Sequence, residues 1–428
     1  MTAKAESRSL ADWLAWQQSL HPRSIDLGLG RIRRVFRRLQ PDYRQPLTIT
    51  VGGTNGKGSC IALLDAVLRA QGLKVGAYTS PHILRYNERI RIDGCEAGDE
   101  DICAAFERIE AVRDGISLSF FEFATLAALD LFARAAVEVQ LLEVGLGGRL
   151  DAVNLVDADA VLITSIDIDH REWLGADRES IGREKAGILR AGRPAVVGDR
   201  HPPRSLILRA QQLGVPVRCL GRDFDHRPAV DAWDWQGWDG RLDGLPPPAL
   251  AGRHQLDNAA AVIAVLRCLA PRLSVSRRAL CQGLASVRLP GRYQLLPGHP
   301  PKLLDVAHNP QAAGLLAEHL RRHWPRRRVL ALFAAMADKD IKGILRQMRP
   351  VVDRWALAPL PGNPRAASPQ RLLTAFGQAG LPTPLHGFTS AAEALAALER
   401  QAGPEDLIVV FGSFFLIAEL LARHGSAA

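Results

Sequence analysis

The chain has 428 residues, of which 47% are hydrophobic and 23% are charged, and its formal net charge is +9 with neutral histidines. This length allows two or three domains with cores of their own, and the composition excludes a largely disordered, collagen-like or disulfide-stapled chain. The Lys and Arg residues are scattered rather than collected in one arm, which favours small anionic substrates as partners.

The N-terminal residues and the cysteines bear on where the protein works. Residues 1–20 lack the apolar core of a signal peptide, and Ser9 with Asp12 predicts a helix-starting capping box. The longest apolar stretch, residues 407–418, is too short to span a bilayer and predicts a buried strand that runs into a helix. The six cysteines include no Cys-x-x-Cys pair, which indicates reduced thiols rather than a zinc site. We therefore expect a cytoplasmic protein that does not contact a membrane.

Short apolar runs alternate with amphipathic stretches in the first part of the chain. Strands are expected at residues 47–51, 140–144 and 160–166, and helices at 59–70 and 256–269. This alternation implies a mostly parallel sheet that is covered by helices on both faces. Around residues 224–250, three tryptophans alternate with polar residues, which predicts a small antiparallel excursion. We expect these tryptophans to pack at the core or an edge rather than to stack on bases.

The pattern breaks near residues 289–292, where we place a domain boundary, and then resumes. The expected strands are 303–307, 329–333, 355–359 and 407–411, and the expected helices are 310–323, 341–348 and 391–401. The predicted domains are therefore residues 1–288, a linker at 289–298, and a smaller α/β domain at 299–428.

The strongest local signal is the glycine-rich run at residues 52–59, between a predicted strand and a predicted helix. Its glycines let backbone N–H groups face an anion, the helix N-terminus adds positive potential, and Lys57 supplies a charge for the outer phosphates. The alternative is a plain glycine-rich turn with an exposed lysine, but the context favours a phosphate loop. A strict Walker A motif has glycine where Val51 stands and Ser or Thr where Gly58 stands, which weakens an ordinary kinase or GTPase as a candidate.

Acidic and polar residues follow other predicted strands. Glu143 ends a buried apolar strand, where a carboxylate is costly without a cation. Because ligands of open α/β sheets gather beyond the carboxyl ends of the strands, Glu143, His170 and the phosphate loop are expected at one edge. The expected fold class is α/β, with an N-terminal P-loop-type ATPase domain built on a mostly parallel sheet and a smaller C-terminal Rossmann-like α/β domain.

Further motifs follow one another along nearly the whole chain. They are SIDLGL at 24–29, GTNGKGS at 53–59, TSPH at 79–82, NERI at 87–90, FEFAT at 121–125, EVGLGGRLDA at 143–152, DH at 169–170, WLG at 173–175, IGREKAGI at 181–188, HQ at 254–255, NAA at 258–260, PGR at 290–292, DVAHNP at 305–310, DKD at 338–340 and FGSF at 411–414. Their joint presence resembles the folylpolyglutamate synthase/dihydrofolate synthase family of the Mur ligase superfamily.

The resemblance implies an ATP-dependent ligase of folate biosynthesis. Such an enzyme adds L-glutamate to dihydropteroate, which forms dihydrofolate, or to the glutamate tail of reduced folates. ATP first phosphorylates the carboxylate, and the amine then attacks the acyl phosphate, so catalysis depends mainly on positioning and charge neutralisation. The implied cofactors are ATP and Mg²⁺, with two ions expected. The C-terminal domain would be the glutamate-ligase domain, and a cleft between two domains would suit the substrates.

The resemblance also implies roles for individual residues. Lys57, Lys185 and His308 are the expected catalytic residues. The expected ATP contacts are Gly53, Thr54, Asn55, Gly56, Lys57, Gly58, Ser59, Asn258, Arg292 and Asp305. The expected magnesium ligands are Ser80, Glu143 and His170, joined by Lys185 as N6-carboxylysine if it is carbamylated. Without the family pattern, His170 would be a satisfied histidine at a strand end, Lys185 a lysine on a solvated helix face, and His308 a turn residue.

The segments that the resemblance associates with the pterin or pteroate group form a third set. They comprise Asp26, Leu27, Gly28, Leu29, Phe121, Glu122, Leu150, Asp151 and Ala152. Phe121 could stack on a pterin or pack in the core of its helix, and both interpretations stay open. Departures from the family pattern at residues 51–53, 334–337 and 414–416 leave the specificity for glutamate and for the acid open.

Two other functions fit the sequence less well. A peptidoglycan-precursor ligase more often has Thr directly after the loop lysine and carries a UDP-binding domain, for which residues 1–46 leave no room. A nucleic-acid binder would need basic clusters interleaved with aromatics, and the clusters at residues 31–38 and 326–328 have none of note. We expect a monomer that binds no nucleic acid, with a solvated basic face at 31–38 that could also attract a polyglutamate tail.

Overall fold

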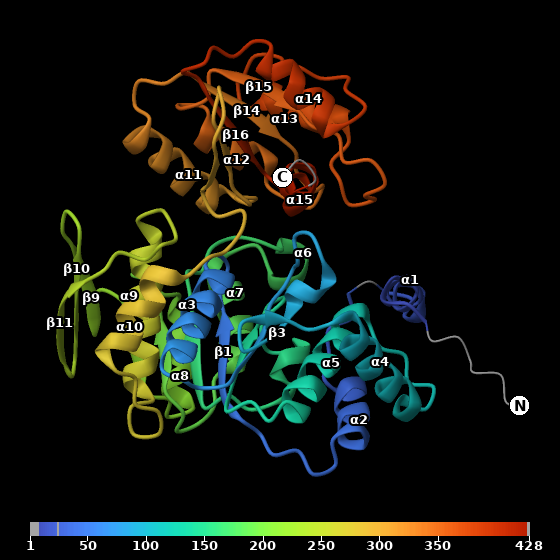
Figure 1. Cartoon of the computed structure of the whole chain (residues 1–428), viewed down its shortest axis with the longest axis vertical. Coiled ribbons are helices and arrows are strands. Elements are labelled where there is room, and N and C mark those ends of the chain that lie inside the picture. Colours follow the sequence, from blue (N-terminus) through green and yellow to red (C-terminus); the bar gives the residue numbers. More distant parts are fainter. Residues whose placement is uncertain (1–7, 24, 426–428) are drawn as a thin grey trace, which may run out of the picture. The chain divides into compact units, whose positions relative to one another are not determined.

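The computed structural model describes residues 8–23 and 25–425, so that Ser24 of the first motif and residues 1–7 lie outside the described residues. The chain forms two compact units (Figure 1). The first comprises Met1–Ile166, Trp173–Ala249 and Leu256–Val287. The second comprises Arg288–Ala428 together with two short segments, Asp167–Glu172 and Leu250–Gln255. Strand β12, which falls within the expected linker, belongs to the sheet of the second unit.

The first unit is built on an eight-stranded sheet with the order β4-β3-β2-β5-β1-β6-β7-β8. Its strands are β1 Leu47–Gly52, β2 Val75–Tyr78, β3 Ile90–Ile92, β4 Cys95–Glu96, β5 Val139–Glu143, β6 Ala160–Ile163, β7 Ala195–Val197 and β8 Val217–Cys219. Neighbouring strands pair in parallel except at β2–β3 and β3–β4, because β3 runs opposite to the other strands. Val51 pairs with Glu143 on one side and with Leu162 on the other, so the three central strands end at the same level. The predicted parallel sheet is confirmed.

Helices and short 3₁₀ turns precede, connect or follow these strands along the chain. They are α1 Leu10–Leu20, α2 Gly30–Leu39, α3 Lys57–Ala70, η1 Tyr86–Arg89, α4 Asp99–Arg113, α5 Phe120–Arg134, η2 Ala152–Leu155, α6 Arg171–Leu174, α7 Arg178–Lys185, η3 Ala186–Ile188, α8 Arg204–Gln212, α9 His254–Cys268 and α10 Arg277–Ser286. The capping box predicted at Ser9 and Asp12 is present at the start of α1. Helix α3 begins two residues before its expected start, because Gly56 adopts the left-handed conformation and serves as its N-cap.

The expected excursion is a three-stranded antiparallel sheet of β9 Phe224–Pro228, β10 Trp233–Gly237 and β11 Gly240–Leu245. Trp233 and Trp235 are buried on β10. Their indole N–H groups donate to Pro246 O at 2.9 Å and to Ala260 O at 3.1 Å. Because a buried indole needs a hydrogen-bond acceptor, these contacts explain how the tryptophans are accommodated in packing, as predicted.

The second unit has a five-stranded sheet with the order β12-β13-β16-β14-β15. The strands are β12 Gln294–Leu296, β13 Lys302–Leu304, β14 Val329–Phe333, β15 Arg354–Leu357 and β16 Leu407–Phe411, and the helices are α11 Pro310–His323, α12 Ile341–Met348, α13 Pro369–Gln378, α14 Ala391–Glu399 and α15 Phe414–Gly425. Only β12 is antiparallel to its neighbour. Strand β13 is shorter than expected and ends before Asp305, whose side chain accepts backbone N–H groups. The expected α/β fold class is confirmed.

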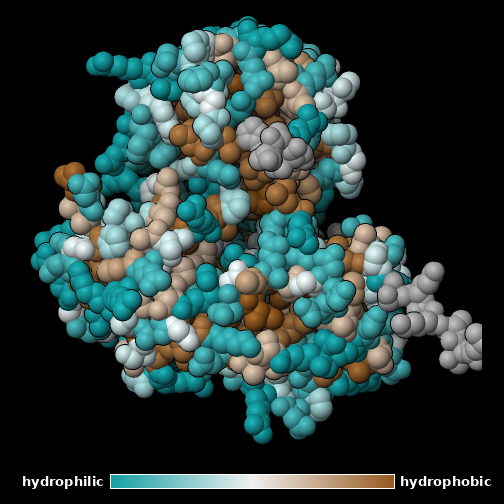
Figure 2. Space-filling model, in the orientation of Figure 1, coloured by the Kyte–Doolittle hydropathy of each residue, from teal (hydrophilic) through white to brown (hydrophobic). Residues whose placement is uncertain are grey.

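The core of each unit is apolar, as the sequence pattern predicts. In the second unit, Phe333 and Phe411 lie 5.1 Å apart between ring centroids on neighbouring strands, both without solvent exposure. On the face shown in Figure 2, hydrophilic and hydrophobic side chains are interspersed. Among the described residues, no helix is long and apolar enough to cross a membrane.

Candidate active site

The glycine-rich run forms a loop between β1 and α3. Gly53 has φ +137°, and a Cβ atom there would lie 1.8 Å from Thr164 Oγ1, so only glycine fits. The Thr54 N–H donates to Ser165 O at 2.7 Å, and Lys57 Nζ donates to Thr54 O at 3.0 Å. The segment that follows β6 therefore holds the loop in place at the N-terminus of α3. A loop in this position is suited to an anion.

Asn258 and Lys185 lie against the same loop. Gly56 has φ +91°, and a Cβ atom there would come within 2.6 Å of Asn258 Oδ1, so the Asn258 side chain lies directly beside the loop. Lys185 Nζ donates to Gly53 O at 2.7 Å, and the side chain is buried. A buried ammonium needs polar partners. The structure thus brings two of the predicted site residues to the phosphate loop from distant parts of the chain.

Glu143 and Ser80 meet at the carboxyl edge of the sheet. Glu143 ends β5 and is 4% exposed, and its Oε2 accepts the Ser80 N–H at 3.2 Å. Ser80 follows β2, which neighbours β5. The parallel order of these strands places both residues at the edge where β1 leads into the phosphate loop.

The side chains at this edge bear on magnesium binding. Among residues 8–23 and 25–425, no group of three or more His, Cys, Asp or Glu side chains could hold a metal ion. Mg²⁺ keeps several waters and is usually bound through one or two carboxylates together with substrate phosphates. One buried carboxylate and a serine beside a phosphate loop fit that mode of Mg²⁺ binding. Glu143 and Ser80 therefore suit a magnesium ion that is bound together with a nucleotide.

The nucleotide contacts expected in the second unit surround Asp305. Its two carboxylate oxygens accept the N–H groups of Tyr293, at 3.1 Å, and Ala307, at 2.8 Å. Burial raises the pKa of Asp305 to about 6, although the nearby Arg292 guanidinium and these hydrogen bonds oppose the shift. Arg292 lies over the ring of Phe414, 5.4 Å from its centroid. The motifs around Arg292, Asp305 and Phe414 are thus neighbours in space.

His308 lies in the loop before α11. Its Nδ1 lies 2.8 Å from Val306 O and its Nε2 lies 3.5 Å from Asp169 Oδ2. Asp169 also accepts a hydrogen bond from Lys339 Nζ at 2.6 Å. Burial by itself raises the pKa of Asp169, but the contact with His308 and the charge of Lys339 outweigh it and hold that pKa far below its usual range. His170, next in the chain, has φ +51°, which is unusual for a residue with a Cβ atom.

Two of the predicted pterin-associated segments are joined by an arginine. Arg31 donates to the Asp26 carboxylate and, at 3.3 Å, to Glu122. Asp26 Oδ2 also lies 3.1 Å from His21 Nε2. Leu27, Gly28 and Leu29 complete the first segment between Asp26 and α2 and are half-buried. Asp26 and Glu122 are therefore anchored to each other through one guanidinium.

In the third pterin-associated segment, backbone N–H groups surround the Asp151 carboxylate. Asp151 accepts the N–H groups of Leu146 at 2.7 Å and Val153 at 3.0 Å, and burial raises its pKa to about 6. Phe121 lies against this loop, because a Cβ atom at Gly145 would come within 2.6 Å of its ring. Leu150 is half-buried and Ala152 is buried. Phe121 also lies 5.8 Å from the Tyr78 ring, so it makes packing contacts here, and its stacking on a pterin stays a prediction.

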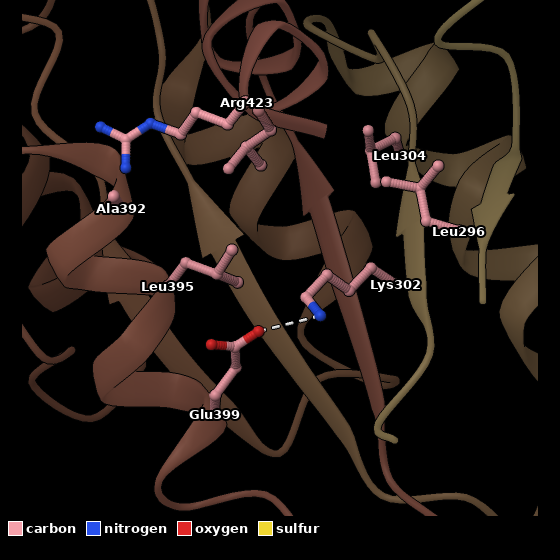
Figure 3. A pocket seen from close by; sticks show the side chains of 8 residues that line it. Leu296, Lys302, Leu304, Ala392, Leu395, Glu399 and Arg423 are labelled. Carbon is pink, nitrogen blue, oxygen red and sulfur yellow. Dashed lines mark ion pairs between the residues drawn. The ribbon is translucent and has the colours of Figure 1, made fainter. Parts of the chain in front are cut away.

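A pocket of about 210 Å³ lies elsewhere in the second unit. Figure 3 shows aliphatic side chains around an ion pair in which Lys302 Nζ lies 2.9 Å from Glu399 Oε1. The lining residues are Leu296, Lys302, Leu304, Ala392, Leu395, Glu399, Leu420 and Arg423. None of them is a predicted site residue, so this pocket is separate from the candidate site.

The sequence predicted no site role for Asp169 and Lys339, and it placed Arg31 on a solvated basic face, whereas the structure pairs Arg31 with two predicted site residues. Arg31 joins Asp26 to Glu122, and Asp169 joins Lys339 to His308. Asp169 and Lys339 belong to quoted motifs, so a charged residue within a motif was a usable signal. Arg31 sits in a run of arginines, where nothing local distinguishes it from its solvated neighbours.

Comparison with known proteins assigns the class and then the family. Residues 291–414 match the family model described as Mur ligase, glutamate ligase domain. A phosphate loop that follows a parallel strand, with this second unit in the same chain, defines an ATP-dependent ligase of the Mur type.

Relatives that match nearly the whole chain identify the family within this class of ligases. The chain is 43% identical to the dihydrofolate synthase/folylpolyglutamate synthase of Escherichia coli (strain K12) over 412 residues, which are 96% of this chain and 94% of that one. It is 42% identical to the structure of E. coli FolC in complex with DHPP and ADP, with a TM-score of 0.92 and coverage of 98% and 99%. A bifunctional folylpolyglutamate synthase/dihydrofolate synthase with Mn, AMPPNP and L-glutamate bound gives 42% identity, a TM-score of 0.90 and coverage of 98% of each chain. The chain belongs to the dihydrofolate synthase/folylpolyglutamate synthase family.

Proposed function

We propose that this chain uses ATP to join L-glutamate to dihydropteroate, and to the glutamate tail of reduced folates. The observation that carries the proposal is the phosphate loop with Lys57, set beside the buried Glu143, in a chain that is 43% identical to a named synthase over 96% of its length. ATP, a divalent cation, L-glutamate and a pterin-bearing acid are the ligands that this function requires.

The chemistry follows from the weakness of a carboxylate as an electrophile. A carboxylate oxygen attacks the terminal phosphorus of ATP, the bond to the bridging oxygen breaks, and ADP leaves. The glutamate nitrogen then attacks the acyl phosphate carbon and loses a proton, and inorganic phosphate departs as the amide forms. Both steps depend on positioning and on neutralising phosphate charge, and the protein must exclude water from the acyl phosphate.

We propose that Lys57 and the backbone N–H groups of residues 54–59 bind the phosphates and neutralise their negative charge. Ser80 and Glu143, together with His170, would hold Mg²⁺, which supplies further positive charge for the phosphates when it is bound. Lys185 as N6-carboxylysine would exchange its ammonium for oxygen ligands to a second Mg²⁺. Its burial against the Gly53 carbonyl supports a role at the loop.

The other assignments concern binding and orientation. Asn258, Arg292 and Asp305 would contact the nucleotide, and the proximity of Asn258 to Gly56 supports the first of these. His308 would be a catalytic residue, and the 3.5 Å approach of its ring to Asp169 supports an oriented imidazole. The anchored pair of Asp26 and Glu122 supports a structured substrate segment.

The test measures ADP, phosphate and labelled amide product with ATP, Mg²⁺ and labelled L-glutamate. Dihydropteroate and tetrahydrofolate are supplied in turn, with a reaction lacking any pterin as the control. We expect equal amounts of ADP and amide product with each acid. ATP breakdown that no pterin stimulates would overturn the proposal. Light scattering on the same sample tests the expected monomer.

A further inference from the structure

The second unit contains a buried ion pair that the proposed reaction does not yet use. Lys339 Nζ lies 2.6 Å from Asp169 Oδ1, and the two side chains are 5% and 9% exposed. A buried ion pair is weak evidence for stability, because desolvation offsets much of the attraction, and well-packed apolar side chains would often serve as well. Such a pair is better explained by what it orients.

Asp169 contacts several residues of the second unit besides Lys339. Its Oδ1 accepts the backbone N–H of His170 at 2.8 Å, and its Oδ2 lies 3.5 Å from His308 Nε2 and 3.4 Å from Asn309 Nδ2. One carboxylate therefore links the backbone of a proposed metal ligand to the ring of a proposed catalytic histidine. The short segment Asp167–Glu172, which carries Asp169 and His170, packs with the second unit.

Lys339 lies in a hydrogen-bonded turn that precedes α12. The Lys339 N–H donates to Met336 O at 3.2 Å, and the Ile341 N–H donates to Lys339 O at 2.9 Å. Asp340 caps α12 by accepting the Gly343 N–H. The remaining acid near the ammonium, Asp338, is 3.7 Å away and also lies 3.3 Å from Arg365. The turn thus directs the lysine toward Asp169.

His170 is held in a conformation that needs such support. Its φ of +51° places it in the left-handed region, which residues with a Cβ atom rarely adopt. Residues in such conformations persist where their surroundings determine the backbone, and the hydrogen bond from the His170 N–H to Asp169 contributes to that restraint. A change in the position of Asp169 would therefore shift His170 and alter the hydrogen bond that restrains its backbone.

We propose that Asp169 and Lys339 are positioning residues whose buried ion pair sets the placement of His170 and the orientation of the His308 ring. The inference rests on the proposed function, because it assumes that His170 serves the divalent cation. Outer-shell partners of metal ligands commonly change metal affinity by about 10- to 100-fold when they are removed. The pair would accordingly act on cation binding without touching the cation.

The test compares the variants Asp169→Asn and Lys339→Met with the double variant. Each single variant leaves a buried charge without its partner and is expected to melt at a lower temperature, whereas the double variant removes both charges and should recover part of that loss. Mn²⁺ binding in the presence of AMPPNP is followed by the electron paramagnetic resonance signal of free Mn²⁺. We expect about tenfold weaker Mn²⁺ binding in all three variants.

The matched control is a different Lys–carboxylate pair of the same unit, Lys302 and Glu399, at 2.9 Å and with 14% and 39% exposure. The variant Lys302→Met/Glu399→Gln should bind Mn²⁺ as the wild type does. Wild-type Mn²⁺ affinity in the folded Asp169→Asn/Lys339→Met variant, or equal weakening in the control, would overturn the inference. Failure of the proposed function would instead appear as wild-type protein whose ATP breakdown no pterin stimulates.

Discussion

Two glycines flank helix α3 and allow the phosphate loop to be tested without changing a charge. Gly56 precedes the helix with φ +91°, and Gly72 follows it with φ +92°. A Cβ atom at Gly72 would meet nothing within 4 Å, whereas one at Gly56 would lie 2.6 Å from Asn258 Oδ1. Alanine at either position therefore imposes the same backbone strain, but only Gly56→Ala displaces Asn258.

The magnitudes follow from these contacts. A residue with a Cβ atom in the left-handed conformation destabilises the folded chain by about 1–2 kcal/mol. Alanine also restricts the unfolded chain more than glycine does, which offsets about 0.4–1 kcal/mol of that destabilisation. Each variant should lose about 1 kcal/mol, which corresponds to a fall of about 2–4 °C in melting temperature for a domain of this size class. The Asn258 amide is the end of a flexible side chain and can rotate away, so Gly56→Ala should be only slightly less stable than Gly72→Ala.

The two variants should differ in nucleotide binding. A displaced Asn258 loses its proposed contact with ATP, and one hydrogen bond contributes about 0.5–1.5 kcal/mol, so we expect AMPPNP to bind up to about tenfold more weakly to Gly56→Ala. Gly72→Ala should bind it as the wild type does. Thermal melts with and without AMPPNP and Mg²⁺, together with calorimetric titration, measure both quantities. Equal AMPPNP affinity in the two variants would refute the placement of the nucleotide at this loop.

Three further predictions concern single groups. Lys57→Met and Glu143→Gln should each abolish amide formation with the melting temperature nearly unchanged, since each removes a charge proposed to act on the phosphates or the cation; near-normal turnover in either would show that the centre is misplaced. Burial lowers the pKa of His319 to about 4, so its neutral form is favoured in the folded chain. Between pH 6.5, near the ordinary pKa, and about pH 4, the unfolded chain therefore binds more protons than the folded chain, and the free energy of unfolding should fall by up to about 3 kcal/mol as the pH drops through that window. His319→Phe should make the free energy of unfolding depend less steeply on pH. Urea unfolding measures this, and a pH profile of the variant that equals that of the wild type would contradict the prediction. Cys95 is exposed whereas burial raises the pKa of the Cys60 thiol, so a thiol reagent should modify Cys95 in the native protein and spare Cys60, as mass spectrometry of digests would show.

Much of the fold could be predicted because its signals are local. The helices Pro310–His323 and Ile341–Met348 and the strands Val329–Phe333 and Leu407–Phe411 have the predicted bounds. Their ends are marked by hydrophobic periodicity and by capping residues such as Asn309 and Asp340. The phosphate loop was predictable for the same reason, since a strand, glycines, a lysine and a helix follow one another without interruption.

The family, too, was identified from the sequence, because long motifs in a constant order need no spatial information. The individual site residues stay predictions, although several that are far apart in the chain meet in the structure. The sequence by itself therefore determined the class of fold, the loop and the set of candidate residues.

Only the tertiary structure decided which charges face each other. Lys185 meets Gly53 across 132 residues of sequence, and Lys339 meets Asp169 across 170. Arg31 pairs with Asp26 and Glu122, while other arginines of the same helix are exposed. Charge pairing depends on the path of loops such as the one that carries Asp169 into the second unit, and no periodic pattern encodes that path. Residue type shows that a buried charge needs a partner, and the folded chain selects it.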